Sequence, residues 1–321
     1  MSHSTSRDMF RSGIGAFAAT LGSAIGLGNI WKFPFLTGMN GGSAFVFAYL
    51  LSVLLVGLPI LVTEHVIGRR MRMNAVPAYA AAGRARIWSA IGYAGLVAAV
   101  LIMAFYTDIA GWVFAYVFKS LRAAAAGKVL GPEDFQALAG GTLEPLAWQT
   151  MVLVLVVIIV GAGVSRGIER ATKTLMPLLL VLLLVCDIRA LTLPNSFAGV
   201  QFLFAPNPGR LSPAVLLSAL GLAFFKLSLG MGTMTTYGSY LPDSTKILPN
   251  ATRVALADTL VSLLAGLAIF PAVFSFGVEP NAGPGLLFIT IPLIFSRLPL
   301  GWLFTAMFFI LAAIATIGAM V

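Results

Sequence analysis

The fold of this 321-residue chain is decided by residues 22–45, which read GSAIGLGNIWKFPFLTGMNGGSAF. Here a cluster of glycines interrupts an apolar segment long enough to cross a bilayer. A later apolar segment carries a similar cluster at residues 227–232, LSLGMG. Close helix packing through small residues would explain a single glycine pair. Two mid-membrane clusters instead predict unwound backbone lining a cavity, as at the binding sites of transporters.

The composition indicates a membrane protein. Hydrophobic residues make up 59% of the chain, charged residues 10%, and the mean hydropathy is +0.98. Soluble domains carry about 25% charged residues, and disordered chains have low hydrophobicity. Cys186 is the single cysteine, which excludes an intrachain disulfide framework. The net charge of +9 could suggest a nucleic-acid partner, but in a membrane protein it reflects which loops carry the basic residues. We therefore expect the lipid bilayer, and no nucleic acid, as the partner of this chain.

Eight segments are long and apolar enough to span a bilayer: residues 13–37, 42–67, 87–118, 147–163, 174–191, 213–241, 251–278 and 298–321. Prolines and asparagines within residues 189–210 predict a structured connector. If the N-terminus is cytoplasmic, the inside loops carry twelve basic residues against seven outside. Cytoplasmic loops carry the excess of Lys and Arg, so we expect a multi-pass protein of the cell membrane with its N-terminus inside.

The quoted stretch closely resembles the first-helix signature of the neurotransmitter:sodium symporter family, which includes the bacterial leucine transporter. Further motifs of that family recur along essentially the whole chain. They are GLP at 57–59 with Glu64 and GR at 68–69, FY at 105–106 with GW at 111–112, RGIER at 166–170, AFFKLSLG at 223–230 and FITIP at 288–292.

The resemblance implies an all-α polytopic fold of the leucine-transporter type, built from two inverted five-helix repeats within twelve helices. Residues 1–321 would form one transmembrane domain, with a first repeat at about 10–192 and part of the second at about 210–321. We expect the chain to be truncated at its C-terminus; a natural half-product, or a protein completed by another chain, is the alternative. The resemblance further implies sodium-coupled uptake of an amino acid or related zwitterion, and a homodimer as one option.

Substrate contacts are also implied by the resemblance. The backbone amides of Leu27 and Gly28 would bind a substrate carboxylate, as the N-terminus of a half-helix favours an anion. Relatives that carry monoamines have aspartate at the position of Gly26, so glycine favours a substrate with its own carboxylate. The Tyr106 hydroxyl would donate to the same carboxylate, the carbonyls of Ala24, Phe225 and Ser228 would bind its ammonium, and Ile102, Phe225 and Met231 would shape the side-chain pocket.

The first sodium site of the family is altered in this sequence. The Ala24 carbonyl and the Asn29 side-chain oxygen are retained, but Lys226 replaces a hydroxyl residue and Asp258 an asparagine. A lysine ammonium has three donors and no acceptor, so it cannot ligate sodium. A cation in mid-membrane is costly unless it is paired. We predict that the Lys226 ammonium occupies the first sodium position and pairs with Asp258; loss of its proton during the cycle, which would give proton coupling, is a variant.

The second sodium site is predicted from the carbonyls of Gly22, Ile25 and Ala312 and the hydroxyl of Thr316. Ala315 replaces the other hydroxyl residue, so we expect weakened or water-completed Na⁺ binding. Chloride is not expected as a cofactor. Tyr49 and Ser262 match the chloride site of animal relatives, but Leu222 and Lys226 replace polar ligands.

Four residues match gating or structural positions of the family. Arg7 and Phe10 resemble the cytoplasmic gate and its aromatic latch, and Lys32 resembles the extracellular gate. Glu64 is predicted to bond the unwound backbone of the sixth segment. Asp108 has no counterpart in the family and lies about 200° around the helix from Tyr106. It could pair with Lys226 or another buried donor, carry a proton or face water.

The leading hypothesis is a secondary transporter of an amino-acid-like substrate. A non-transporting carrier or ligand sensor that uses the same cradle is the alternative. An enzyme is poorly supported, because the sequence has no HExxH or Walker A motif and offers His3 and His65 alone for imidazole acid–base chemistry.

Overall fold

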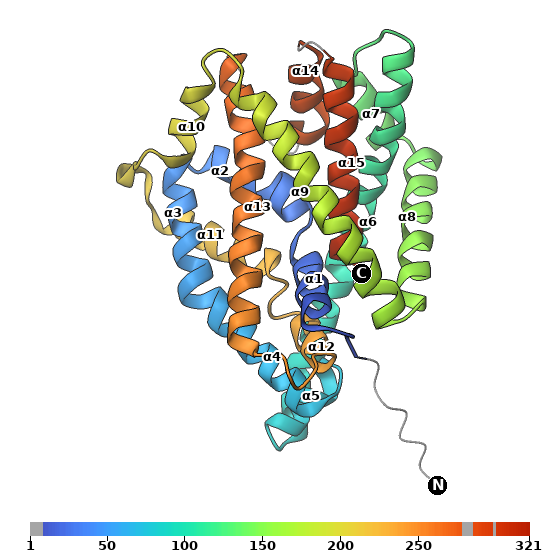
Figure 1. The fold of residues 1–321 in the computed structure, drawn as a ribbon, viewed down its shortest axis with the longest axis vertical. Helices are drawn as coiled ribbons and strands as arrows, with labels where there is room; N and C mark the ends of the chain where they lie inside the picture. Colours follow the sequence, from blue (N-terminus) through green and yellow to red (C-terminus); the bar gives the residue numbers. More distant parts are fainter. Residues whose placement is uncertain (1–8, 278–284, 298–299) are drawn as a thin grey trace.

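The computed structural model describes residues 9–277, 285–297 and 300–321, and the regular elements within these ranges are helices. The predicted segment ends at 278 and 298, and Arg7, lie outside the described residues. Figure 1 shows a bundle in which α5 (Ala75–Ala82) and α12 (Thr233–Ser239) lie at the lower end of the view. The opposite end holds α7 (Pro132–Gly140), α10 (Ser196–Phe204) and α14 (Ile291–Ser296).

Six helical stretches of the described chain are long and apolar enough to cross a membrane: Ser43–Met71, Arg86–Ala125, Leu143–Gly161, Val164–Leu191, Ile247–Ser275 and Gly301–Met320. Within these stretches the α-helices are α3 (Ser43–Ser52), α4 (Leu58–Met71), α6 (Ser89–Ala125), α8 (Leu143–Gly161), α9 (Glu169–Leu191), α13 (Ile247–Ser275) and α15 (Gly301–Met320). Shorter turns also join the elements: η2 (Val53–Gly57), η3 (Arg86–Trp88), η4 (Val164–Ile168), η5 (Pro208–Arg210) and η6 (Leu286–Thr290).

The first predicted segment is a broken span. Helix α1 (Gly13–Ala24) ends where Ile25 turns to extended backbone, with φ −81° and ψ 111°. The chain becomes helical again in η1 (Gly28–Lys32) and α2 (Phe33–Met39), and the two halves are bent by 51°. Counted as one span, this pair raises the number in the described residues to seven.

The sixth predicted segment is divided into two helices, and neither is long enough to span a bilayer alone. Helix α11 (Pro213–Lys226) ends at the glycine cluster and α12 begins at Thr233. Between them Gly230 and Gly232 have φ of 75° and 76°, left-handed values that residues with a Cβ rarely adopt. The glycines therefore account for the interruption that divides this segment.

The largest difference between a predicted and an observed segment boundary is at the start of the fifth segment. The span ending in α9 begins at Val164, whereas the sequence predicts its start at residue 174. The cluster of cations at residues 166–173 predicts a loop. In the structure, Arg166, Arg170 and Lys173 instead lie on the exposed side of the first helical turns. The structured connector at 189–210 contains α10 and η5.

Candidate functional site

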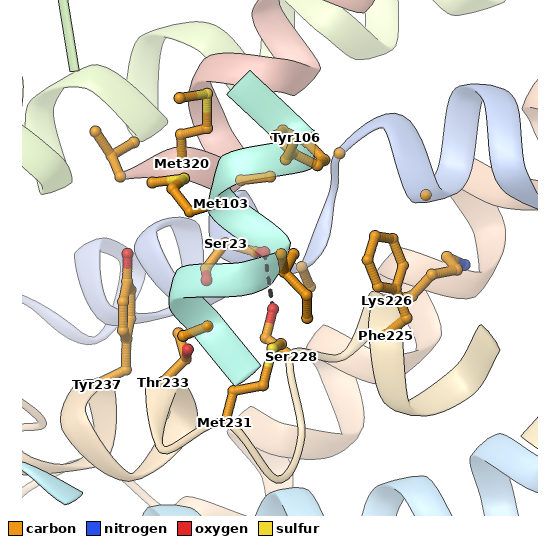
Figure 2. A pocket seen from close by; sticks show the side chains of 17 residues that line it. Ser23, Met103, Tyr106, Phe225, Lys226, Ser228, Met231, Thr233, Tyr237 and Met320 are labelled. Atoms are coloured by element: carbon orange, nitrogen blue, oxygen red, sulfur yellow. Dashed lines mark hydrogen bonds between the residues drawn. The ribbon is translucent and has the colours of Figure 1, made fainter. Parts of the chain in front are cut away.

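The two interruptions enclose a cavity of about 190 Å³ (Figure 2). Its walls come from α1, α6, α11, α12 and α15 and from the backbone between the broken halves. The lining residues are Ser23, Ala24, Gly26, Gly28, Ala99, Ile102, Met103, Tyr106, Phe225, Lys226, Ser228, Met231, Thr233, Tyr237, Ala319, Met320 and Val321.

Seven of the eight residues predicted to contact substrate line this cavity: Ala24, Gly28, Ile102, Tyr106, Phe225, Ser228 and Met231. The eighth, Leu27, has a buried side chain and contributes its backbone amide instead. The structure thus brings the whole predicted set together, although their roles stay predictions. Several other lining residues were not predicted, among them Ala99 and Met103. Their spacing from Ile102 and Tyr106 places them on the same side of α6, which could have revealed them.

Tyr106 joins α6 to the first interruption. Its hydroxyl accepts a hydrogen bond from the Leu27 amide at 3.0 Å. A Cβ built at Gly26 would lie 2.7 Å from the same hydroxyl and 2.7 Å from the Cβ of Ala319. An aspartate at position 26 would therefore collide with this arrangement, so glycine is required for the close approach.

The interruption releases carbonyl groups of α1. The Gly26 amide donates to Asn29 Oδ1 at 3.1 Å, so the Gly22 carbonyl loses its helical donor. The Leu27 amide bonds Tyr106, which releases the Ser23 carbonyl in the same way. That carbonyl accepts from the Ser228 hydroxyl at 3.3 Å, the contact drawn as a dashed line in Figure 2. This hydrogen bond links the two interrupted segments directly.

Lys226 is the centre of a buried polar cluster beside the cavity. Its ammonium lies 3.0 Å from Asp258 Oδ2, and both side chains have 0% exposed area. It also donates to Tyr49 Oη at 2.7 Å and to Ser262 Oγ. Tyr49 in turn donates to Asp258 Oδ2 at 3.1 Å. Lys226 and Asp258 therefore form the pair that the sequence predicts, and the ammonium points away from the cavity in Figure 2.

Asn29 is oriented differently from the sequence prediction. Its oxygen, expected as a sodium ligand, accepts from the Gly26 amide. Its amide nitrogen donates to Asp258 Oδ1 at 2.7 Å and to Ser262 Oγ at 3.1 Å. The Asp258 carboxylate accepts but does not donate, so it attracts the amide nitrogen. In this structure Asn29 thus serves the Lys226–Asp258 pair rather than presenting an oxygen to a cation.

Residues predicted for the second sodium site lie on α1 and α15, which pack together. A Cβ built at Gly318 of α15 would lie 2.9 Å from the Gly22 carbonyl oxygen, so that released carbonyl faces α15. The Thr316 hydroxyl is buried and donates to the Ala312 carbonyl at 2.7 Å. Ile25 is the extended residue at the end of α1. The sodium-binding role of these residues stays a prediction.

The gating and structural residues have specific partners. Glu64 of α4 accepts from the Gly230 amide at 2.7 Å and from the Thr235 hydroxyl at 3.3 Å, so it bonds the interrupted backbone as the sequence predicts. The ring of Phe10 packs against Tyr237 and Tyr240, with centroids 6.0 Å from each.

Lys32 and Asp108 lie outside the buried cluster. The Lys32 ammonium lies over the Phe225 ring at 4.1 Å. Asp108 is partly exposed and has no ion-pair partner among the described residues, and Lys226 bonds Asp258 instead. The predicted option of an Asp108–Lys226 pair is therefore wrong, because Asp258 takes that position.

Comparisons with known proteins agree on one family. Residues 7–128 and 140–321 match the model of the sodium:neurotransmitter symporter family. The chain is 43% identical to the sodium-dependent transporter YhdH of Bacillus subtilis, over 97% of this chain and 70% of that protein. It is 36% identical to a sodium-dependent transporter of Haemophilus influenzae, over 92% of this chain and 67% of that protein.

A solved structure shows the same fold. The crystal structure of MhsT in complex with L-phenylalanine matches with a TM-score of 0.90 and 40% sequence identity, over 98% of this chain and 72% of that chain. The predicted fold class, an all-α polytopic membrane protein of the leucine-transporter type, is thereby confirmed. With its characteristic broken helices and its match along nearly the entire length, this chain belongs to the sodium:neurotransmitter symporter family.

Proposed function

We propose that this protein is a sodium-coupled symporter for an amino acid or a closely related zwitterion, bound between the two interrupted helices. The observation that carries the proposal is the Leu27–Tyr106 hydrogen bond at the cavity wall. A substrate carboxylate could replace this bond, because the Leu27 amide and the Tyr106 hydroxyl both have a proton to donate. The glycine at position 26 leaves no competing carboxylate there.

The cavity also suggests the kind of side chain. Ile102, Met103, Met231 and Met320 line it, and flexible methionines adapt to apolar groups of different shapes. These residues favour an amino acid with an apolar side chain. The similarity to MhsT, solved with L-phenylalanine, supports the same assignment.

We propose further that one of the two family sodium ions is replaced by Lys226. The ammonium supplies a positive charge that is fixed by Asp258, Tyr49 and Ser262, so an ion is not needed to complete this cluster. The coupling ion would then bind at the second site, through the carbonyls of Gly22, Ile25 and Ala312 and the Thr316 hydroxyl. Tyr49 and Ser262, which match the chloride site of animal relatives, both accept hydrogen bonds from Lys226, and Tyr49 also donates to Asp258. This engagement argues against chloride as a cofactor.

Uptake into proteoliposomes tests the proposal. With sodium outside and potassium inside, we expect accumulation of radiolabelled apolar amino acids that disappears when the sodium gradient is dissipated. Saturable binding without accumulation would instead support the alternative, a non-transporting ligand-binding protein. Two companion proposals are a cytoplasmic N-terminus and two repeats, at about 10–192 and 210–321, of opposite orientation. Labelling of single introduced cysteines from either side of the membrane would test both.

A further inference from the structure

A basic pocket lies where the chain before α1 meets the start of α9, remote from the substrate cavity. It has a volume of about 630 Å³ and is lined by Arg11, Ser165, Arg166, Glu169, Arg170 and Lys173, with Thr174 at its edge. Four of these residues are cations and one is an acid. The pocket therefore carries a surplus of positive charge, which the proposed transport function does not use.

The single carboxylate of the pocket is already engaged. Glu169 is 2% exposed, and its Oε1 lies 2.5 Å from the Lys173 ammonium. Its Oε2 accepts from the Arg11 backbone amide at 2.8 Å. Within the described part of the chain, no carboxylate lies within ion-pair distance of the guanidinium groups of Arg11, Arg166 or Arg170. Among the described residues, three exposed guanidinium groups thus surround a hollow and have no protein carboxylate bound to them.

Two arginines at the C-terminal end of α4, Arg69 and Arg72, are instead bonded by protein acceptors. The Arg69 guanidinium donates to the Thr245 carbonyl at 2.5 Å. The Arg72 guanidinium donates to the carbonyls of Ser239 and Leu241 and pairs with Asp243. Arg69 and Arg72 therefore have protein partners, whereas the guanidinium groups of the pocket have no carboxylate partner among the described residues.

The length of the span that carries the pocket indicates a position at the level of lipid headgroups. Val164–Leu191 is a span of 28 residues. At 1.5 Å per residue it is about 42 Å long, which matches a bilayer with its headgroup regions rather than the hydrocarbon core of about 30 Å. The first turns of this span, which carry Arg166, Arg170 and Lys173, therefore extend into the headgroup region.

We propose that this pocket binds the phosphate of an anionic phospholipid. Guanidinium groups bind phosphate through paired hydrogen bonds, and basic pockets between membrane helices bind anionic headgroups. Arg11 precedes α1, whereas Arg166 and Arg170 belong to the start of the α9 span. A bound headgroup would therefore bridge these two elements and hold the chain before α1 against α9, next to the existing Arg11–Glu169 hydrogen bond.

Native mass spectrometry of the 321-residue chain tests this site, with phosphatidylglycerol and phosphatidylcholine as alternative lipids. We expect phosphatidylglycerol to bind preferentially, and the double variant Arg166→Gln/Arg170→Gln to weaken that binding by about tenfold or more. The matched control Arg84→Gln/Arg86→Gln removes two exposed basic residues from another loop and should leave it unchanged. The charge-retaining variant Arg166→Lys/Arg170→Lys should keep most of the preference for phosphatidylglycerol. Retention would show that substitution at these two positions does not by itself disrupt the site.

Three outcomes would overturn the proposal. The first is equal binding of both lipids by the unmodified chain. The second is an equal loss of phosphatidylglycerol binding in Arg166→Gln/Arg170→Gln and in the control Arg84→Gln/Arg86→Gln. The third is displacement of phosphatidylglycerol by inorganic phosphate at an ionic strength where chloride has no effect, since the pocket would then be a site for a soluble anion.

Discussion

Lys226 and Asp258 carry the most consequential departure from the family pattern at the scale of single residues. Burying two charges costs several kcal/mol per ion, and their attraction offsets this only when further hydrogen bonds complete the site. Here Tyr49, Ser262 and Asn29 supply those bonds. The pair is therefore stable only as a unit, since either residue alone would leave an uncompensated charge among buried groups.

The pair should behave non-additively under substitution. We expect Lys226→Thr and Asp258→Asn, made singly, each to lower the free energy of unfolding by about 3–5 kcal/mol, because each leaves one buried charge without its partner. The double variant Lys226→Thr/Asp258→Asn should recover most of that loss. Unfolding in detergent would measure the coupling in a double-mutant cycle, and simple addition of the two losses would contradict a coupled pair.

Residue identities predicted this pair, but they did not predict the orientation of Asn29. Lysine cannot ligate sodium and needs an acid when buried, so Lys226 and Asp258 could be matched from the sequence. The Asn29 amide can rotate to present either end, and its choice depends on the Gly26 amide, Ser262 and Asp258 together. Such a three-dimensional set of donors and acceptors is not visible in the sequence.

Tyr106 allows a sharp test of substrate binding. Tyr106→Phe removes the acceptor of the Leu27 amide and the expected donor to the substrate carboxylate. We expect a loss of amino-acid affinity of about tenfold to 100-fold, since bonds to a charged group contribute about 1.5–3 kcal/mol. The control is Tyr116→Phe, whose buried hydroxyl has no hydrogen-bond partner in the described part of the chain. Equal effects of the two substitutions on ligand binding would show that Tyr106 has no direct role.

At the scale of elements, the contact between α4 and α12 positions the second interruption. Glu64 of α4 bonds the Gly230 amide, and Gly68 lets the two helices approach closely. Glycine clusters were sufficient to predict that both segments are interrupted. They could not predict the start of the α9 span, because exposed arginines in a first helical turn look the same in sequence as arginines in a loop.

Gly68→Ala tests that close approach. A Cβ at Gly68 would lie 1.9 Å from the Thr235 carbonyl oxygen, so α12 must shift and its bonds to Glu64 should weaken. We expect a loss of about 1–3 kcal/mol in unfolding free energy and faster amide exchange at residues 227–232. Gly221→Ala on α11, where a Cβ meets nothing within 4 Å, should be neutral or slightly stabilising. Unchanged exchange in Gly68→Ala would contradict this role of the helix contact.

At the scale of the whole molecule, the substrate cavity and the charge cluster share the ends of the same broken helices. The Phe225 ring lines the cavity, whereas the adjacent Lys226 ammonium bonds Asp258 of α13. Gly26 lies against Tyr106, and its amide holds Asn29 toward the same cluster. The geometry around the cavity is therefore tied to a fixed internal charge, which we propose takes the place of an ion.

The dependence of amino-acid binding on sodium concentration tests this central claim most directly. It should be measured for the native chain and for Lys226→Thr/Asp258→Asn, at constant ionic strength with choline as the replacing cation. A single sodium-dependent step is predicted for the native chain, and a second, additional sodium requirement for the double variant, because the restored threonine and asparagine supply oxygen ligands. An identical sodium response in both proteins would contradict the replacement of the first sodium ion by Lys226.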